Sequence, residues 1–354
     1  MPFSELIGQE RASSALRSAL ARDALHHAYL FGGPEGVGKA TAARLLAQIV
    51  NCDAAEADRP CGACAPCRKI ARGTHPDVFH LAEERVMAKA GRWEPKGGRT
   101  PSKDIVVDQV RDLVDHRLSL RRFEGRRRVV VIDPADAMNA QAQNALLKTL
   151  EEPPDETTLV LVASNPDALL PTIRSRCARV SFAPLADGVL AARLAADGVP
   201  AAEIPFVCAL AGGSLSRAAE VARRRRQEQA RRAKGGEAPP DPVRDAAGLD
   251  PDDASSWIAY AAIHGEDRES ARDTCQLLEL WLRDVLAIQA VGEDAPLALP
   301  DRAAESLAAA AAVPPAGAAE RIELARAAVA ALKQNASPAL ALERMLIGWF
   351  HGDR

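Results

Sequence analysis

The chain has 354 residues, of which 47% are hydrophobic and 26% are charged. This composition is typical of a globular protein and excludes collagen-like and wholly disordered chains, and the length favours two or three domains. Because 45 basic residues are balanced by 48 acidic ones, nothing marks a histone-like nucleic-acid binder. The N-terminus lacks a signal-peptide core, and prolines interrupt the most apolar stretch, so we expect a cytoplasmic protein without a membrane span.

The first half of the chain alternates between strand and helix patterns. Short apolar runs typical of buried parallel strands cover residues 28–31, 129–132 and 159–163. Helical patterns cover residues 40–50, 108–118 and 139–150. This alternation predicts an α/β domain over residues 1–183, with a parallel sheet and helices on both of its faces. Residues 84–104 are rich in Gly, Lys and Arg without periodicity, which predicts a mobile insertion.

The second half of the chain contains helix patterns and no further strand signals. Residues 184–222 predict a small helical domain, and residues 254–354 predict a larger all-helical one. Between them, a basic run and a Gly-, Pro- and Asp-rich segment predict a linker over residues 223–253. We interpret the run Arg223–Arg226 as a solvated helix end in preference to a DNA contact, because such runs are weak signals alone.

Four of the seven cysteines fall within residues 52–67, and they are Cys52, Cys61, Cys64 and Cys67. In a reducing compartment thiols stay free, and four closely spaced thiolates can surround a tetrahedral zinc ion. Four protein ligands leave no open position for water, so the pattern predicts a structural zinc and disfavours a catalytic one. An accidental run of thiols or a redox switch remains the alternative.

A glycine-rich segment at residues 33–41 follows a predicted strand and opens a predicted helix, as a phosphate-binding loop requires. The glycines whose backbone N–H groups would face phosphates are Gly33, Gly36 and Gly38. Lys39 would reach the outer phosphates, but Ala40 replaces the Ser or Thr that should bind Mg²⁺. Thr41 lies about 100° further around the helix and cannot simply substitute. The segment therefore predicts that ATP or ADP can bind without a complete magnesium site.

The second predicted strand is followed by the acidic residue that a magnesium–nucleotide site needs. Asp133 is a potential metal partner, but Pro134 stands where a water-orienting carboxylate would be expected. Phosphoryl transfer depends on positioning and electrostatic stabilisation, so losing both groups should cost many powers of ten in rate. We therefore predict negligible hydrolysis by this chain, with Asp136 as an alternative base that remains open.

Several motifs together resemble the clamp-loader branch of the AAA+ proteins. Besides the cysteine cluster, they are HAYLFGGPEGVGK (27–39), NALLKTLEEPP (144–154), TIRSRC (172–177), GGSLSR (212–217) and NASPALALE (335–343). The resemblance implies an AAA+ α/β domain, a helical lid and a helical collar that joins a hetero-pentameric ring. These match the three predicted regions.

The resemblance also implies roles for single residues and for partners. Arg176 matches an arginine that projects into the ATP site of a neighbouring subunit, while Asn165 and Arg217 match the family's first and second sensors. The implied partners are gamma/tau-type and delta-type subunits, the sliding clamp and primer-template DNA, with no membrane. On this reading the chain is a non-hydrolysing subunit of a DNA polymerase III holoenzyme, with no polymerase residues of its own.

Two other interpretations remain. An active clamp-loader ATPase similar to the gamma/tau subunit is favoured by the intact glycines and Lys39, and disfavoured by Ala40 and Pro134. A zinc-dependent nucleic-acid-binding module with a decayed ATPase is the third. The basic residues Arg121, Arg122 and Arg126–Arg128 would suit any of the three.

Overall fold

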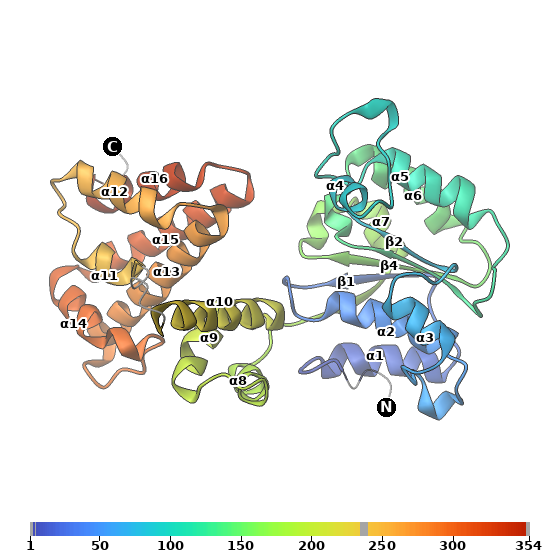
Figure 1. Ribbon diagram of the computed structural model, residues 1–354, viewed down its shortest axis with the longest axis horizontal. Helices are drawn as coiled ribbons and strands as arrows, with labels where there is room; N and C mark the ends of the chain where they lie inside the picture. Colours follow the sequence, from blue (N-terminus) through green and yellow to red (C-terminus); the bar gives the residue numbers. More distant parts are fainter. Residues whose placement is uncertain (1–2, 4, 234–239, 352–354) are drawn as a thin grey trace. The chain divides into compact units, whose positions relative to one another are not determined.

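The computed structural model describes residues 3, 5–233 and 240–351 (Figure 1). The chain divides into two compact units. The first comprises residues 1–189 with 214–216, and the second comprises residues 190–213 with 217–354. None of the helices in the described ranges combines the length and apolarity needed to cross a lipid bilayer.

The first unit is built on a five-stranded sheet in the order β2-β3-β4-β1-β5, and every neighbouring pair is parallel. The strands are β1 (Ala28–Gly32), β2 (Val78–Leu81), β3 (Arg128–Ile132), β4 (Thr157–Ala163) and β5 (Ala178–Ser181). The three predicted strands are confirmed, and β2 and β5 are added at the two edges. Gly32 pairs with Ala163, and Ile132 pairs with Leu161, so three strands end at one edge of the sheet.

Helices cover both faces of the sheet, which confirms the predicted fold class (Figure 1). One face, which includes Phe31 and Val131, packs against α1 (Glu10–Ala21), α2 (Lys39–Asn51) and α3 (Ala65–Ala71). The other face, which includes Leu30 and Val130, packs against α5 (Val107–Arg111), its π-helical continuation η3 (Asp112–Leu118), α6 (Ala140–Glu151) and α7 (Pro171–Arg176). Alternate strand residues thus enter two separate apolar layers, as both faces of a buried parallel sheet require.

Residues 84–104, predicted to be a mobile insertion, form an ordered segment that contains α4 (Glu84–Lys89) and η2 (Lys96–Gly98). The carboxylate of Glu84 is fully buried and forms a bidentate pair with Arg99 at 2.6 and 2.7 Å. It also accepts hydrogen bonds from Trp93 Nε1 at 3.1 Å and from the Ser102 N–H at 2.8 Å. Burial alone would raise the pKa of Glu84, but these donors hold it below its ordinary value. The segment has no hydrophobic periodicity because the buried carboxylate of Glu84 and its hydrogen-bond donors, instead of an apolar face, stabilise it.

The described residues of the second unit form helices and connecting loops, without a strand. Its helices are α8 (Asp187–Ala196, which begins in the first unit), α9 (Ile204–Ala211), α10 (Leu215–Ala233, whose first two residues belong to the first unit), α11 (Pro242–Ala247), α12 (Ala254–His264), α13 (Arg268–Val291), α14 (Ala303–Ala312), α15 (Pro315–Lys333) and α16 (Pro338–His351). Helix α13 is the longest of these and packs against α11, α14, α15 and α16. Its fully buried side chains include Leu278, Leu282 and Val285.

The boundaries in this half differ from those predicted. Residues 223–233 continue helix α10 rather than forming a linker, and α11 interrupts the remainder. Residues 234–239 of the predicted linker lie outside the described residues. Two arginines on α10 explain the difference, because Arg217 and Arg224 both pair with Asp273 of α13, at 2.6 and 3.0 Å. These ion pairs join most of the predicted lid to the C-terminal helices in one unit.

Single helical turns complete the described structure. They are η1 (Glu56–Asp58), η4 (Ala135–Ala137), η5 (Pro166–Ala168), η6 (Ala201–Glu203) and η7 (Pro300–Arg302). Of these, η4 and η5 directly follow the ends of β3 and β4, beside the glycine-rich loop. The edge where the strands end therefore carries the residues of the candidate nucleotide site.

Candidate functional site

The glycine-rich loop connects β1 to α2, as predicted, and its conformation requires glycine. Gly36 and Gly38 have φ angles of +73° and +103°, which L side chains rarely adopt. A Cβ at Gly33 would lie 2.1 Å from the Phe182 carbonyl oxygen. The carbonyl of Gly36 accepts a hydrogen bond from the Ser216 N–H at 3.3 Å. The loop is thus closely fitted to its surroundings in the first unit.

Lys39 begins α2, and its side chain turns back onto its own loop. It is 5% exposed, and Nζ donates to the carbonyl oxygens of Gly33 and Pro34, both at 2.5 Å, and to Ser164 Oγ at 3.4 Å. Burial lowers the pKa of Lys39, an effect that nearby carboxylates, chiefly Asp133, partly oppose. The ammonium group would have to leave two carbonyls to reach a phosphate.

No hydroxyl group immediately follows the lysine. Position 40 carries the methyl group of an exposed alanine, and Thr41 is the next residue along α2. On an α-helix consecutive side chains are about 100° apart. The conventional position for a magnesium-binding hydroxyl is therefore filled by Ala40.

Two aspartates follow β3. Burial raises the pKa of Asp133, and the neighbouring Lys39 opposes this rise. Asp136 Oδ2 accepts hydrogen bonds from the backbone N–H groups of Ser164 and Asn165 at 3.1 and 2.8 Å. Asp136 thus ties the ends of β3 and β4 together, and its other oxygen has no hydrogen-bond partner among the described residues.

The predicted sensor residues lie in different units. Asn165 directly follows Ser164, which contacts Lys39, so it lies beside the loop. Arg217 belongs to the second unit, where it donates to the Leu210 carbonyl at 2.9 Å and pairs with Asp273. It also bonds to Gln276. The guanidinium of Arg217 thus has structural partners on α9 and α13.

Arg176 is the last residue of α7, and its guanidinium lies at the surface. Nη2 pairs with Glu151 Oε1 at 2.6 Å, and Nη1 donates to the Thr172 carbonyl at 3.0 Å. About a third of the Arg176 side chain is exposed. Burial raises the pKa of the adjacent Cys177 to about 12, so this thiol packs as a small apolar group.

The four clustered cysteines converge. Their sulfur atoms all lie within 4.8 Å of one another, and Cys52 Sγ and Cys64 Sγ are 3.9 Å apart. Zn–S bonds of about 2.3 Å in a tetrahedron place sulfurs roughly 3.8 Å apart. Backbone hydrogen bonds, chiefly from the Cys64 N–H, lower the pKa of Cys61 to about 6, whereas burial raises the pKa of Cys67 above its ordinary value. The arrangement can hold a metal ion.

Three residues that sequence reasoning missed support these sites. Glu151, in the NALLKTLEEPP motif, holds Arg176. The buried side chain of Gln9 donates to the carbonyls of Val37 and Ala183 at 3.2 and 2.7 Å, joining the loop to the segment after β5. Ser164 contacts Lys39. Only Glu151 lay within a recognisable motif.

Comparisons with known proteins match the sequence to one family. A family model described as "DNA polymerase III, delta subunit" matches residues 8–186. DNA polymerase III subunit delta' of Pseudomonas aeruginosa is 41% identical over 204 residues, covering 56% of this chain and 57% of that protein. DNA polymerase III subunit tau of Escherichia coli is 37% identical over 175 residues, covering 49% of this chain and 24% of that protein.

The matches leave part of each relative uncovered. The chain spans little more than half of the delta' relative and about a quarter of the tau relative. A solved gamma subunit-related protein from Thermotoga maritima is aligned over 97% of this chain and 100% of its own, at 16% identity and a TM-score of 0.40. A TM-score this low adds no support to the assignment.

Proposed function

The chain belongs to the DNA polymerase III delta-subunit family, and on that premise we propose that it is a delta'-type subunit of the clamp loader. In this role it does not hydrolyse ATP itself. It supplies Arg176 to the ATP site of a neighbouring subunit and helps to load the sliding clamp onto primer-template DNA. The partners would be gamma/tau-type and delta-type subunits in a hetero-pentameric ring.

The proposal rests chiefly on the glycine-rich loop, whose lysine is already bonded within the loop and which lacks a magnesium-binding hydroxyl group. Lys39 is bonded to two carbonyls of its own loop, and Ala40 offers no oxygen to Mg²⁺. Pro134 follows Asp133 and has no carboxylate with which to orient water. Without these groups the site can hold ADP or ATP at most, because phosphoryl transfer depends on metal, lysine and water being placed together.

Arg176 supports the second part of the proposal. A guanidinium is permanently charged, and one supplied in trans to a γ-phosphate can be worth roughly 10³- to 10⁵-fold in rate. The ion pair that holds Arg176 to Glu151 is partly exposed, and exposed pairs contribute about 1 kcal/mol or less. Releasing the arginine toward a neighbouring phosphate therefore costs little.

We assign the four-cysteine cluster a structural zinc ion. Four sulfurs close the coordination shell, so the ion would supply cross-linking of the chain and no Lewis-acid chemistry. Cys52 follows the end of α2, and Cys64 and Cys67 lie at the start of α3 and within it. The ion would therefore join these two helices.

The alternative is an active ATPase similar to the tau relatives. It is favoured by the intact glycines, by Lys39 and Asp133, and by the free carboxylate oxygen of Asp136. Steady-state ATP hydrolysis by the purified chain, with and without primed DNA, separates the two functions.

We expect turnover near background that does not change in Lys39→Ala. The same assay on an assembled loader, which hydrolyses ATP through its other subunits, is the positive control. Turnover by the chain alone that disappears in Lys39→Ala would contradict the proposal and establish the ATPase.

A further inference from the structure

An exposed basic loop, residues 119–127, connects η3 to β3. Its two apolar side chains lie largely in solvent, with Phe123 82% and Leu120 67% exposed. It also carries the arginines Arg121, Arg122, Arg126 and Arg127. Exposed side chains gain no free energy from burial and therefore do not stabilise the conformation of the loop. Polar groups beneath the loop must hold it in place.

The carboxylate of Asp77, just before β2, holds the tip of this loop. Asp77 is 2% exposed. Its Oδ1 accepts a hydrogen bond from the Phe123 N–H at 2.8 Å, and its Oδ2 accepts from the N–H groups of Glu124 and Gly125 at 2.8 and 2.6 Å. Three successive backbone donors thus converge on one buried carboxylate, which fixes the loop to the edge of the sheet.

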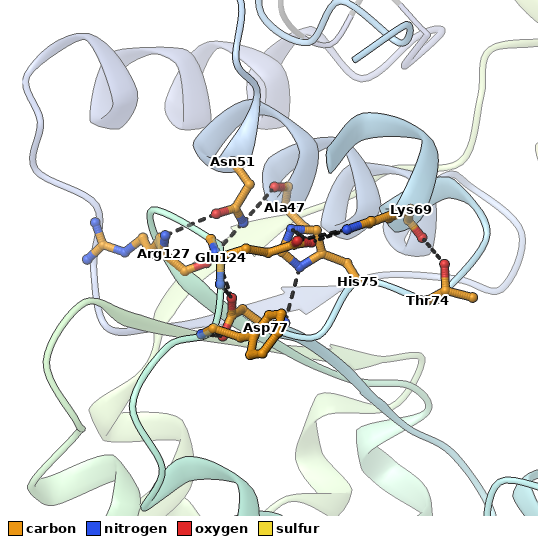
Figure 2. Close-up of polar contacts among 10 residues, drawn as sticks. Ala47, Asn51, Lys69, Thr74, His75, Asp77, Glu124 and Arg127 are labelled. Carbon is orange, nitrogen blue, oxygen red and sulfur yellow. Dashed lines mark hydrogen bonds and ion pairs between the residues drawn. The ribbon is translucent and has the colours of Figure 1, made fainter. Parts of the chain in front are cut away.

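Asn51 connects the loop to the cysteine module, defined as residues 52–67, and Figure 2 shows its contacts with Arg127. Its Oδ1 accepts a hydrogen bond from the Arg127 N–H at 3.0 Å, and its Nδ2 donates to the Arg127 carbonyl at 2.9 Å. Asn51 is the last residue of α2, and Cys52 follows it directly. A movement of Cys52 would therefore be transmitted to the base of the loop.

Lys69 makes a second connection (Figure 2). Its Nζ contacts both carboxylate oxygens of Glu124 at 2.7 Å. Lys69 lies on α3, whose N-cap is Cys64 and whose interior contains Cys67. A seven-residue helix is far too short to be stable alone, so a metal ion bound to these cysteines would contribute to its order.

We propose that the cysteine module helps to position the 119–127 loop through Asn51 and Lys69, so that metal loss weakens these two connections and loosens the loop, while Asp77 still holds its tip. The inference rests on the structural metal proposed above. It makes the placement of Phe123 and of the exposed arginines depend on metal occupancy, although the cluster is separate in sequence from the loop. Asn51 and Lys69 are positioning residues and have no chemical role.

Limited digestion with trypsin tests the inference, because the loop carries its own cleavage sites at Arg121, Arg122 and Arg126. The full chain is digested with zinc bound and after chelation, the cleaved bonds are identified by mass spectrometry, and zinc is measured in the same samples. We expect chelation to raise the cleavage rate in the loop about tenfold, as the loss of the two Asn51–Arg127 hydrogen bonds and the Lys69–Glu124 ion pair predicts. Cleavage in the second unit should not change.

A glycine variant tests the connection with the cysteines left intact. A Cβ at Gly125 would lie 2.9 Å from Asn51 Oδ1 and 3.1 Å from Asp77 Oδ2, whereas a Cβ at Gly188 would meet nothing within 4 Å. We expect Gly125→Ala to raise loop cleavage about tenfold at unchanged zinc content, because the methyl group separates the loop from both anchors. Gly188→Ala is the matched control and should behave as the wild type.

The outcomes separate this inference from the proposed metal. Chain that neither contains nor takes up zinc would refute the metal and, with it, the inference. Zinc that can be removed without faster loop cleavage would overturn the inference alone. Chelation that raises cleavage everywhere would overturn the inference, because metal loss would then unfold the first unit instead of loosening the loop. Wild-type cleavage of Gly125→Ala would also overturn it, because contact with Asn51 would then not hold the loop in place.

Discussion

Asp77 combines burial with full hydrogen bonding, and its ionisation should therefore contribute to stability. Burial alone would raise the pKa of this carboxyl, but the N–H groups of Glu124, Gly125 and Phe123 hold it below its ordinary value. A carboxyl with a lowered folded pKa stabilises the protein above its unfolded pKa of about 3.9. That stabilisation is lost as the pH falls through the folded value.

Asp77→Asn should accordingly lower the free energy of unfolding by about 2 kcal/mol at neutral pH, because an amide cannot accept three hydrogen bonds as a carboxylate does. The difference from the wild type should shrink as the pH falls below about 4. Chemical denaturation across this pH range measures both quantities. Asp167→Asn, at a side chain that is 84% exposed, is the control and should change stability by roughly 0.5 kcal/mol or less. A deficit that is the same at every pH would contradict the assigned ionisation.

At the scale of elements, a metal ion bound by the cysteine module would cross-link α2 and α3, which also contact each other through the hydrogen bond from Gln48 to the Cys67 carbonyl. We expect one zinc ion per chain and a lower melting temperature after chelation, because ion binding contributes directly to the folding of such modules. Cys61 is exposed, so Cys61→Ser removes a ligand without opening a cavity and should weaken zinc retention. Cys208→Ser, outside the cluster, should retain the ion. Stoichiometric disulfides among the four thiols in native protein, with no metal, would contradict this expectation.

The elements that sequence patterns predicted are those with continuous apolar burial. β1, β3 and β4 are almost wholly buried and were recognisable as apolar runs. The edge strands β2 and β5 are four residues long and only partly buried, so VFHL and ARVS gave no comparable signal. Helix α4 was missed because its anchor pairs Glu84 with Arg99, fifteen residues away. Such contacts between distant residues have no periodicity to detect.

In the candidate sites, too, features set by local sequence were predictable, and features set by contacts between distant residues were not. The cysteine spacing and the glycine-rich loop follow from local sequence, and the structure brings each set together. The bonding of Lys39 to its own loop depends on side-chain orientation that no motif records. The structural partners of Arg217 lie on α9 and α13, so they required the tertiary structure.

At the scale of the assembled loader, the proposed function makes ATP hydrolysis in a neighbouring subunit depend on an arginine from a subunit that does not hydrolyse ATP. The loop around Lys39 and the surface position of Arg176 both support a subunit that acts on a neighbour's nucleotide. The family match at residues 8–186 includes both.

The most direct test is the DNA- and clamp-stimulated ATPase of a reconstituted loader that contains Arg176→Ala. We predict that assembly is retained and stimulated turnover falls by about tenfold or more, because an arginine supplied in trans stabilises the transition state. Arg193→Ala, at an exposed arginine paired with Asp197, is the matched control and should leave turnover unchanged. Wild-type turnover in a fully assembled Arg176→Ala loader would contradict the account.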